Sequence, residues 1–480
     1  MPPVPSATAP IRLPRAPRAP FHLPAALAAV LAAAAPAAAQ HFPADPNLLA
    51  LVRERVEQGR AKGIVLGVLE ADGSTRIVSW GDPGHGAQPL GERSVFEIGS
   101  ITKVFTGTLL AEMAERGEVR LEEPVQDLLP PGVTVPSRSG KAIRVVDLST
   151  QVSGLPRLPG NLRPADATNP YADYRAENLY AALGGLTLDR DPGERYEYSN
   201  LGVGLLGHAL ALRAGVSYED LVRRRILEPL GMSHTGTTLT PEMQAWMVKG
   251  HDQAGNAVGI WDFDALAGAG ALRSDMHDML AFLKGNVGEP RSPLERAMRT
   301  AHAVRAPAGP NMEIGLNWHV RAVGEDRIVW HNGGTGGFRT FIGFDPARRV
   351  GVVVLTNSAH GADDIGFHLV NPAVPLQPPP APPRQRSEVA VVRDILQRYV
   401  GVYELTPQFR IEITLDGAGL GLQATGQPRL PLFAESETAF FLKVVDAQVQ
   451  FVVEAGVVTA LVLHQGGAAQ TARRLPPPSL

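Results

Sequence analysis

The sequence predicts an α+β protein followed by a small all-β domain. Strand-like stretches lie at both ends of a largely helical segment within residues 40–373, which indicates an antiparallel sheet with helices packed on it. A proline-rich linker is predicted at residues 374–387. Residues 388–480 then hold short alternating stretches with a turn about every ten residues, which is typical of a small β-barrel or sandwich.

The composition is that of a globular protein and excludes several functions. The 480 residues are enough for two or three domains, and 44% of them are hydrophobic and 19% charged. A formal net charge of −3 gives no basic surface for nucleic acid or for an anionic membrane. The chain has no cysteine, which excludes disulfides, thiolate catalysis and cysteine-ligated metals.

Residues 1–39 have the pattern of a secretory signal peptide. Three arginines between positions 12 and 18 precede an apolar run over residues 23–39, which ends in small residues before Gln40. The alternative is a membrane anchor, but a run broken by Pro36 is at the lower limit for spanning a bilayer. No cysteine follows for a lipoprotein anchor. We expect cleavage after Ala39 and a bacterial periplasmic or secreted protein without a membrane span.

The first part of residues 40–373 predicts two strands and then helices. Residues 64–81 fit two strands joined by an Asp-Gly turn. Apolar residues at helical spacing follow Ser100 and stop at Gly117. A second helix begins in "YSNLGVGLLGHALALRAG" and stops at Gly215.

The later part of the chain predicts strands. "RIVWHNGG" (residues 327–334) and "FRTFIGFDPARRVGVVVLTN" (residues 338–357) fit adjacent strands, with a turn around Asp345. After the proline-rich linker, we expect a short helix over residues 388–397. Alternation in residues 411–415 then begins the all-β pattern.

A serine and a lysine three positions apart are the first candidate for chemistry. Ser100 and Lys103 lie in "FEIGSITKVFTG", on one face of the predicted helix. Serine is a poor nucleophile until a base takes its proton and donors hold the developing oxyanion. Burial of a lysine at a helix start lowers its pKa and makes it a usable base. The alternative is a chance pair of polar residues, and this motif alone does not decide between the two.

Two further segments bear on that question. "PGERYEYSNLG" contains Tyr198-Ser199-Asn200, and "HNGGTGGFRTFIGFDP" begins at His331 with a glycine-rich strand edge that a ligand backbone could approach closely. Taken alone, Tyr198 is explained as a core aromatic residue and the glycines as a bulge.

Together, and in this order, the three segments resemble the penicillin-recognising serine hydrolases, specifically the class C β-lactamase and DD-peptidase family. That family has Ser-x-x-Lys at a helix start, then Tyr-x-Asn, then Lys-Thr-Gly or His-x-Gly on a strand. The stretches "LSTQVSGLP", "ILEPLGM", "GAGALRSDMHDMLAFL" and "GLNW" are also similar to the family, and the resemblance spans residues 42–372. It implies a β-lactamase/transpeptidase-like fold and a substrate that is a small molecule or peptide: a β-lactam, a D-Ala-type peptide or an ester.

The resemblance also implies the roles of individual residues. Ser100 attacks the carbonyl and becomes acylated, while Lys103 and Tyr198 share the proton transfers. Asn200 hydrogen-bonds Lys103 and the substrate amide. The oxyanion hole consists of the backbone N–H groups of Ser100 and Gly334. Substrate binding extends along the glycine-rich strand: His331, Asn332, Gly333 and Gly334. This chemistry needs no metal and no cofactor.

The chain departs from the family pattern at two positions. His331 stands where class C β-lactamases carry a lysine, and Gln151 stands where relatives often show histidine. A lysine is a fixed cation suited to a carboxylate, whereas histidine titrates near pH 6.5. Either a charged His331 contacts anionic substrates, or a neutral imidazole serves as a hydrogen-bond partner. His-x-Gly occurs in esterases and peptidases of the family, which makes efficient β-lactam hydrolysis an open point.

Three other functions compete with this interpretation. "HGADDIGFH" offers His360, Asp363, Asp364 and His368 to a metal, but its spacing is that of a polar helix face, so we expect a solvated helix end. Gly-x-Ser-x-Gly, the motif of α/β-hydrolases, is absent. A penicillin sensor or cell-wall-binding protein, acylated without turnover, stays open and is distinguished by the lifetime of acylated Ser100.

Overall fold

The computed structural model describes residues 40–476 except for a few short gaps: 85–87, 380–385, 407–408, 418, 426–428, 444–446 and 466–467. The predicted signal peptide, residues 1–39, lies outside the described residues. The chain divides into two compact units, Met1–Gln377 and Pro378–Leu480. Among the described residues, no helix is both long enough and apolar enough to cross a bilayer.

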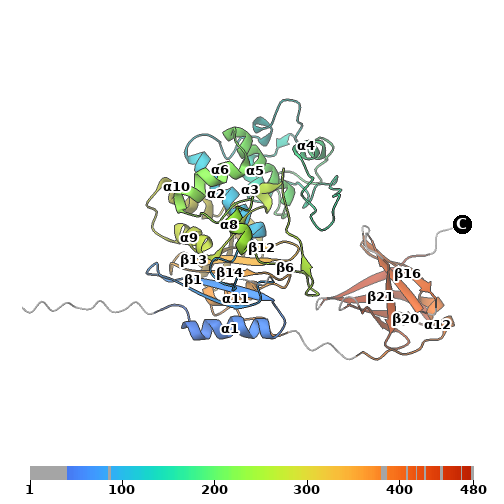
Figure 1. Ribbon diagram of the computed structural model, residues 1–480. Helices are drawn as coiled ribbons and strands as arrows, with labels where there is room; N and C mark the ends of the chain where they lie inside the picture. Colours follow the sequence, from blue (N-terminus) through green and yellow to red (C-terminus); the bar gives the residue numbers. More distant parts are fainter. Residues whose placement is uncertain are drawn as a thin grey trace, which may run out of the picture. The chain divides into compact units, whose positions relative to one another are not determined.

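An eight-stranded antiparallel sheet forms the centre of the first unit (Figure 1). Its strand order is β2-β1-β14-β13-β12-β11-β10-β9. The strands are β1 (Gly63–Leu69), β2 (Thr75–Gly81), β9 (Ala306–Gly309), β10 (Met312–Ile314), β11 (His319–Val323), β12 (Asp326–Gly334), β13 (Arg339–Asp345) and β14 (Val350–Thr356). Gly73, at φ +85°, makes the predicted Asp-Gly turn between β1 and β2.

Both faces of this sheet are buried. Along β1, Ile64 and Leu66 pack in one apolar core with α1 (Asp45–Glu57) and α11 (Asp363–Val370), whereas Val65 packs in the other. This alternation follows from the two-residue period of a strand. Figure 1 shows α1 along one side of the sheet and most of the helices on the other. The antiparallel sheet with packed helices confirms the predicted α+β class.

The remaining helices of the first unit build the larger core. They are α2 (Thr102–Glu115), α3 (Val145–Ser149), α4 (Ala176–Gly184), α5 (Asn200–Ala214), α6 (Tyr218–Val222), α7 (Glu228–Leu230), α8 (Pro241–Trp246), α9 (Met276–Val287) and α10 (Pro293–His302). Short helical turns are η1 (Gly99–Ile101), η2 (Val125–Leu128), η3 (Arg223–Leu227) and η4 (Ala267–Ala269). Two-residue strands pair β3 (Phe96–Glu97) with β8 (Arg273–Ser274), β4 (Ser137–Arg138) with β5 (Lys141–Ala142), and β6 (Gly250–His251) with β7 (Ala257–Val258). As predicted, a left-handed glycine, Gly215 at φ +68°, ends α5.

Glycines allow the elements around α2 to pack closely. A β-carbon at Gly107 would lie 2.1 Å from the carbonyl oxygen of Leu316, and one at Gly207 of α5 would lie 2.8 Å from Gly268. The second contact presses η4 against α5, and the Gly268 and Ala269 carbonyls reach side chains of α2. Residues 102–113 of α2 are all buried.

The second unit is a closed antiparallel barrel, which confirms the predicted all-β domain. Its strands are β15 (Gly401–Thr406), β16 (Phe409–Asp416), β17 (Gly419–Ala424), β18 (Leu430–Ala434), β19 (Ala439–Phe441), β20 (Ala447–Glu454), β21 (Val457–Gln465) and β22 (Ala468–Arg474). The core includes Tyr403, Ile411, Ile413, Val449 and Leu461.

The short helix of this unit differs from its expected position. It is α12 (Arg393–Tyr399), whereas residues 388–397 were expected to be helical. The N–H of Val389 donates to the carbonyl of Ala434 at 2.9 Å, which holds the preceding chain in an extended form. The helix therefore begins five residues later than expected.

We predict that a chain ending at Gln377 folds and melts within a few degrees of the first unit of the full chain. Its core closes at Val374, and its last residue is fixed by two contacts: Gln377 N–H donates to Asp364 at 2.9 Å, and Arg60 donates to the Gln377 carbonyl at 3.2 Å. Differential scanning calorimetry measures this. A large loss of melting temperature would mean that the two units unfold as one cooperative body.

Candidate active site

Ser100 lies in the turn η1, directly before α2. Gly99 has φ +51°, and a β-carbon there would lie 2.7 Å from the backbone nitrogen of Gly334. A β-carbon at Gly333 would lie 2.0 Å from the carbonyl of Ile98. Only residues without a side chain allow the end of β12 to approach this turn, so the glycines bring the Gly334 N–H beside Ser100.

Lys103 lies one helical turn after Ser100 and is 0% exposed. Its Nζ donates to Ser100 Oγ at 3.0 Å and to the Ala269 carbonyl at 2.5 Å. Burial, and then the charge of Arg157, hold the pKa of Lys103 well below 10.5. No described acidic residue forms an ion pair with it. Burial thus favours the uncharged form of the amine, which is the form that can take a proton from the serine.

Tyr198 faces the same lysine. The Nζ atom of Lys103 lies 4.9 Å from the centre of the Tyr198 ring. Burial raises the pKa of Tyr198 above its usual value of 10, and a hydrogen bond with Ser100 opposes this less strongly. The phenol is thus protonated at neutral pH and has a proton to donate.

A loop after α3 fixes the Tyr-x-Asn motif in place. The side-chain oxygen of Gln151 accepts from the Ser199 N–H at 2.7 Å, and the Ser199 hydroxyl donates to the Pro156 carbonyl at 2.6 Å. The Arg157 carbonyl accepts from the Asn200 N–H at 2.9 Å. Gln151, which stands where relatives often show histidine, therefore positions the segment that leads into α5.

Asn200 does not make the expected hydrogen bond to Lys103. The donors of Nζ go to Ser100 and Ala269, and Asn200 Oδ1 is buried without a partner among the described residues. Asn200 lines a small cavity of about 30 Å³ together with Ser100 and Trp261. Its unpaired oxygen is thus an acceptor beside the candidate nucleophile.

His331 is 1% exposed and does not line the cavity that Ser100 borders. Its Nδ1–H donates to the Asn332 carbonyl at 2.6 Å, which leaves Nε2 as an unpartnered acceptor. Burial, and then His319 and Lys103, lower the pKa of His331 well below 6.5. The ring is neutral, which favours the hydrogen-bonding alternative over a charged contact with substrate.

The other predicted residues meet around one cavity of about 480 Å³. Tyr198, Asn332, Gly333 and Gly334 line it together with Ser100. The structure adds residues that the motifs did not identify: Arg157, Tyr196, Trp261, His319, Trp330 and Arg339. Tyr196, Trp330 and Arg339 lie in quoted segments but outside the motifs themselves, whereas the other three lie outside those segments.

Glu97 is a further residue that the sequence analysis missed. It is buried in β3, and its carboxylate accepts from the Trp261 N–H at 2.6 Å and from the Thr335 hydroxyl at 2.7 Å. Burial raises the pKa of Glu97 to about 7. The carboxylate thus joins two walls of the cavity. The available signal was its place three residues before Ser100, within the quoted stretch.

The histidines and aspartates of "HGADDIGFH" do not converge on one point. They contact separate groups: Asp363 with Asn332, Asp364 with Arg55, His360 with the Gln253 carbonyl and His368 with the Val374 carbonyl. Asp364 is buried in an ion pair at 2.5 Å. The expectation of a solvated helix end was therefore wrong for this residue, because Arg55 of α1 covers it.

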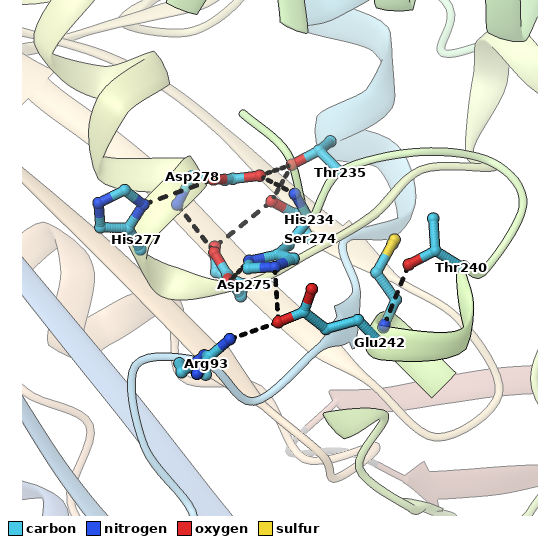
Figure 2. A network of polar contacts seen from close by, with 10 residues as sticks. Arg93, His234, Thr235, Thr240, Glu242, Ser274, Asp275, His277 and Asp278 are labelled. Carbon is cyan, nitrogen blue, oxygen red and sulfur yellow. Dashed lines mark hydrogen bonds and ion pairs between the residues drawn. The ribbon is translucent and has the colours of Figure 1, made fainter. Parts of the chain in front are cut away.

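Among the described residues, only His234, Asp275 and Asp278 lie close enough to share a metal ion. Figure 2 shows them in a network at the start of α9. Asp275 accepts from the Asp278 N–H at 2.8 Å, and Asp278 accepts from the Thr235 hydroxyl at 2.8 Å. His234 Nδ1 lies 2.9 Å from Asp275. Donors of the chain itself occupy both carboxylates, so the group acts as a helix cap.

Comparison with known proteins places most of the chain in one family. Residues 48–371 match the family described as Beta-lactamase, and residues 385–474 match a domain of unknown function, DUF3471. The chain is 32% identical over 322 residues to the D-alanyl-D-alanine-carboxypeptidase/endopeptidase AmpH of Escherichia coli (strain K12), covering 62% of this chain and 80% of the relative. It is 26% identical over 407 residues to a penicillin-binding protein of Bacillus subtilis (strain 168), covering 81% and 89%.

Solved structures confirm the predicted β-lactamase/transpeptidase-like fold. A beta-lactamase/D-alanine carboxypeptidase from Yersinia pestis superimposes with a TM-score of 0.57 at 26% identity, over 69% of this chain and 100% of that one. A beta-lactamase/D-alanine carboxypeptidase from Pseudomonas syringae gives a TM-score of 0.60 over 68% and 98%. At 20% identity, the second shows the fold alone.

We predict that His331→Lys lowers the melting temperature and damages the hydrolysis of a neutral ester and of a cephalosporin alike. The substitution places an ammonium at a buried position beside Lys103 and His319. Since the pKa of His331 lies well below 6.5, the pH profiles of kcat/KM from about pH 6 to 8 contain no contribution from it. His331→Gln is the neutral control. A selective gain on the cephalosporin would instead indicate a charged contact.

Proposed function

Since the chain belongs to the beta-lactamase family of serine hydrolases, we propose that it cleaves an amide or ester through an acyl-enzyme on Ser100. The observation that carries this proposal is the fully buried amine of Lys103, whose Nζ lies 3.0 Å from Ser100 Oγ and whose pKa is lowered by that burial. An uncharged lysine beside a serine hydroxyl is a base matched to that nucleophile. A lysine kept only for stability would gain nothing from a buried site without a carboxylate partner.

Acylation follows from the protonation states of the three side chains. Lys103 takes the proton of Ser100 as Oγ attacks the substrate carbonyl carbon. The negative charge that develops on the carbonyl oxygen is held by the N–H groups of Ser100 and Gly334. Tyr198 then donates its proton to the leaving nitrogen or oxygen, the bond to that atom breaks, and the ammonium of Lys103 reprotonates the phenolate.

Deacylation uses the same groups in reverse. Tyr198 takes a proton from the attacking water as it passes its own proton to Lys103, and the acyl bond to Oγ then breaks as Lys103 returns a proton to Ser100. Asn200 Oδ1, buried and unpaired, accepts from an N–H of the substrate. Asn332 and Gly333 border the cavity where the rest of the substrate lies, and neutral His331 supports the strand from beneath.

The substrate stays open among three kinds: a β-lactam, a D-Ala-type peptide and a small ester. The names of AmpH and of the Yersinia pestis protein support a D-alanyl peptide or a β-lactam. The relative named as a penicillin-binding protein supports a second candidate function, in which Ser100 is acylated but the acyl group is not hydrolysed. A nitrophenyl ester, a chromogenic cephalosporin and a D-Ala-D-Ala peptide, with the lifetime of the acyl-enzyme on each, separate these cases.

We also predict export to the periplasm with cleavage after Ala39. The basic start and the apolar run over residues 23–39 support it. N-terminal sequencing of the protein from fractionated cells should return a chain that begins at Gln40. A chain lacking residues 2–39 should stay in the cytoplasm as the control. An intact N-terminus in the cytoplasmic fraction would contradict the proposal.

We predict that Ser100→Ala abolishes turnover of every accepted substrate and prevents labelling by a fluorescent penicillin or a fluorophosphonate. The substitution removes the only atom that the mechanism acylates, while the small side chain fits the same turn. Ser137→Ala, at an exposed position in β4, is the matched control and should keep both properties. Mass spectrometry that finds the adduct on another serine of the wild-type protein would overturn the assignment.

A further inference from the structure

Arg157 is an exposed cation at the main cavity with no carboxylate partner among the described residues. Its side chain lines the cavity together with Ser100, and its guanidinium lies 5.0 Å from the centre of the Tyr198 ring. We propose that Arg157 binds an anionic group of the substrate, a carboxylate, and so selects anionic over neutral substrates. This inference rests on the proposed function, because it concerns the substrate that Ser100 attacks.

The backbone of Arg157 is fixed by hydrogen bonds. Among the described residues, its guanidinium has no hydrogen-bond acceptor or ion-pair partner that a ligand would have to displace. Its carbonyl accepts from the N–H groups of Asn200 at 2.9 Å and of Leu201 at 3.2 Å, at the start of α5. The same loop is bound by Ser199 through Pro156. The backbone that carries the guanidinium is thus fixed, and the guanidinium lies beside Tyr198 at the cavity that Ser100 borders.

The cavity around Arg157 favours an anion. None of the side chains that line it is an aspartate or glutamate, and a second cation, Arg339, borders it. Arg339 already donates to the carbonyls of Thr335 at 2.7 Å and Phe338 at 2.8 Å, and Asp363 lies near enough to offset part of its charge. One nitrogen of Arg339 is thus engaged, whereas no acceptor in the part of the chain that the structure describes contacts the guanidinium of Arg157.

Because His331 is uncharged, the positive charge for substrate binding has to come from another residue. Class C β-lactamases carry a lysine there, but His331 is buried and neutral, so this strand position offers no charge to a substrate. A guanidinium offers a planar fork that matches the two oxygens of a carboxylate. The charge for substrate recognition thus lies on the loop after α3 instead of on β12.

A competing role for Arg157 is to tune the proton-transfer groups. After burial, the charge of Arg157 is the second cause of the lowered pKa of Lys103. The same charge offsets part of the rise that burial causes in the pKa of Tyr198. If that were its function, its loss would change the hydrolysis of neutral and anionic substrates equally. A carboxylate contact affects anionic substrates selectively, so a pair of matched substrates separates the two roles.

The test compares 4-nitrophenyl acetate with the mono-4-nitrophenyl ester of succinic acid, which has the same leaving group and an added carboxylate. In Arg157→Gln, kcat/KM for the succinate ester should fall about tenfold relative to the acetate, mainly through KM. Arg157→Lys should restore part of the preference, and added salt should weaken it in the wild type. Arg163→Gln, on the same loop but outside the cavity, is the control and should change neither ester.

A carboxylate on the leaving group is tested in the same way by comparing 3-acetoxybenzoic acid, whose leaving group is 3-hydroxybenzoate, with phenyl acetate. Selective loss on either anionic ester supports the proposal. Equal loss on neutral and anionic esters in Arg157→Gln would overturn it and leave the tuning role. Failure of the wild type to hydrolyse any ester, with no labelling of Ser100, would refute the serine hydrolase proposal itself and the subsite with it. Normal labelling with no charge preference would refute the subsite alone.

Discussion

The structure of the first unit depends on one costly feature, a lysine amine buried without a counter-ion. Removing an ammonium from water costs more than its hydrogen bonds return, so burial lowers the pKa of Lys103 and favours its uncharged form. Its two acceptors, Ser100 Oγ and the Ala269 carbonyl, come from segments far apart in the chain. The surrounding packing must hold those segments together, since Lys103 contributes little stability of its own.

Close backbone packing supplies that support. Glycine positions let α2 touch the Leu316 carbonyl and let α5 press η4 toward α2, which places Ala269 over Lys103. The same logic operates at Gly99 and Gly333, where β12 meets the turn that carries Ser100. A β-carbon at any of these positions would lie within 2.8 Å of the facing backbone, so the elements would have to move apart. The glycines are thus as necessary to the site geometry as the polar residues.

The periodicity of apolar residues and the turn residues predicted the features of the fold that depend on neighbouring residues. The β1–β2 turn, the glycine that ends α5, the strands β12 to β14 and the closed barrel all follow from periodicity and turn residues, and the structure confirms them. The motifs also led to residues that the structure brings together around Ser100, although their catalytic roles stay predictions. What the sequence could not supply was burial: the missing Asn200–Lys103 bond, the ion pair of Asp364 and the place of Glu97 all depend on contacts between distant segments.

Burial also changes what the histidine of the third motif can do. From sequence alone, a histidine in place of lysine suggests a titratable charge. In the structure the His331 side chain is buried on β12 beside His319 and Lys103, where the protonated ring is disfavoured. An added positive charge there would also weaken the basicity of Lys103, on which the nucleophile depends. The strand position therefore stays neutral, while Arg157 offers a cation at an exposed position of the cavity. The exposed position lets the guanidinium stay charged at little cost, whereas the buried one favours a neutral ring.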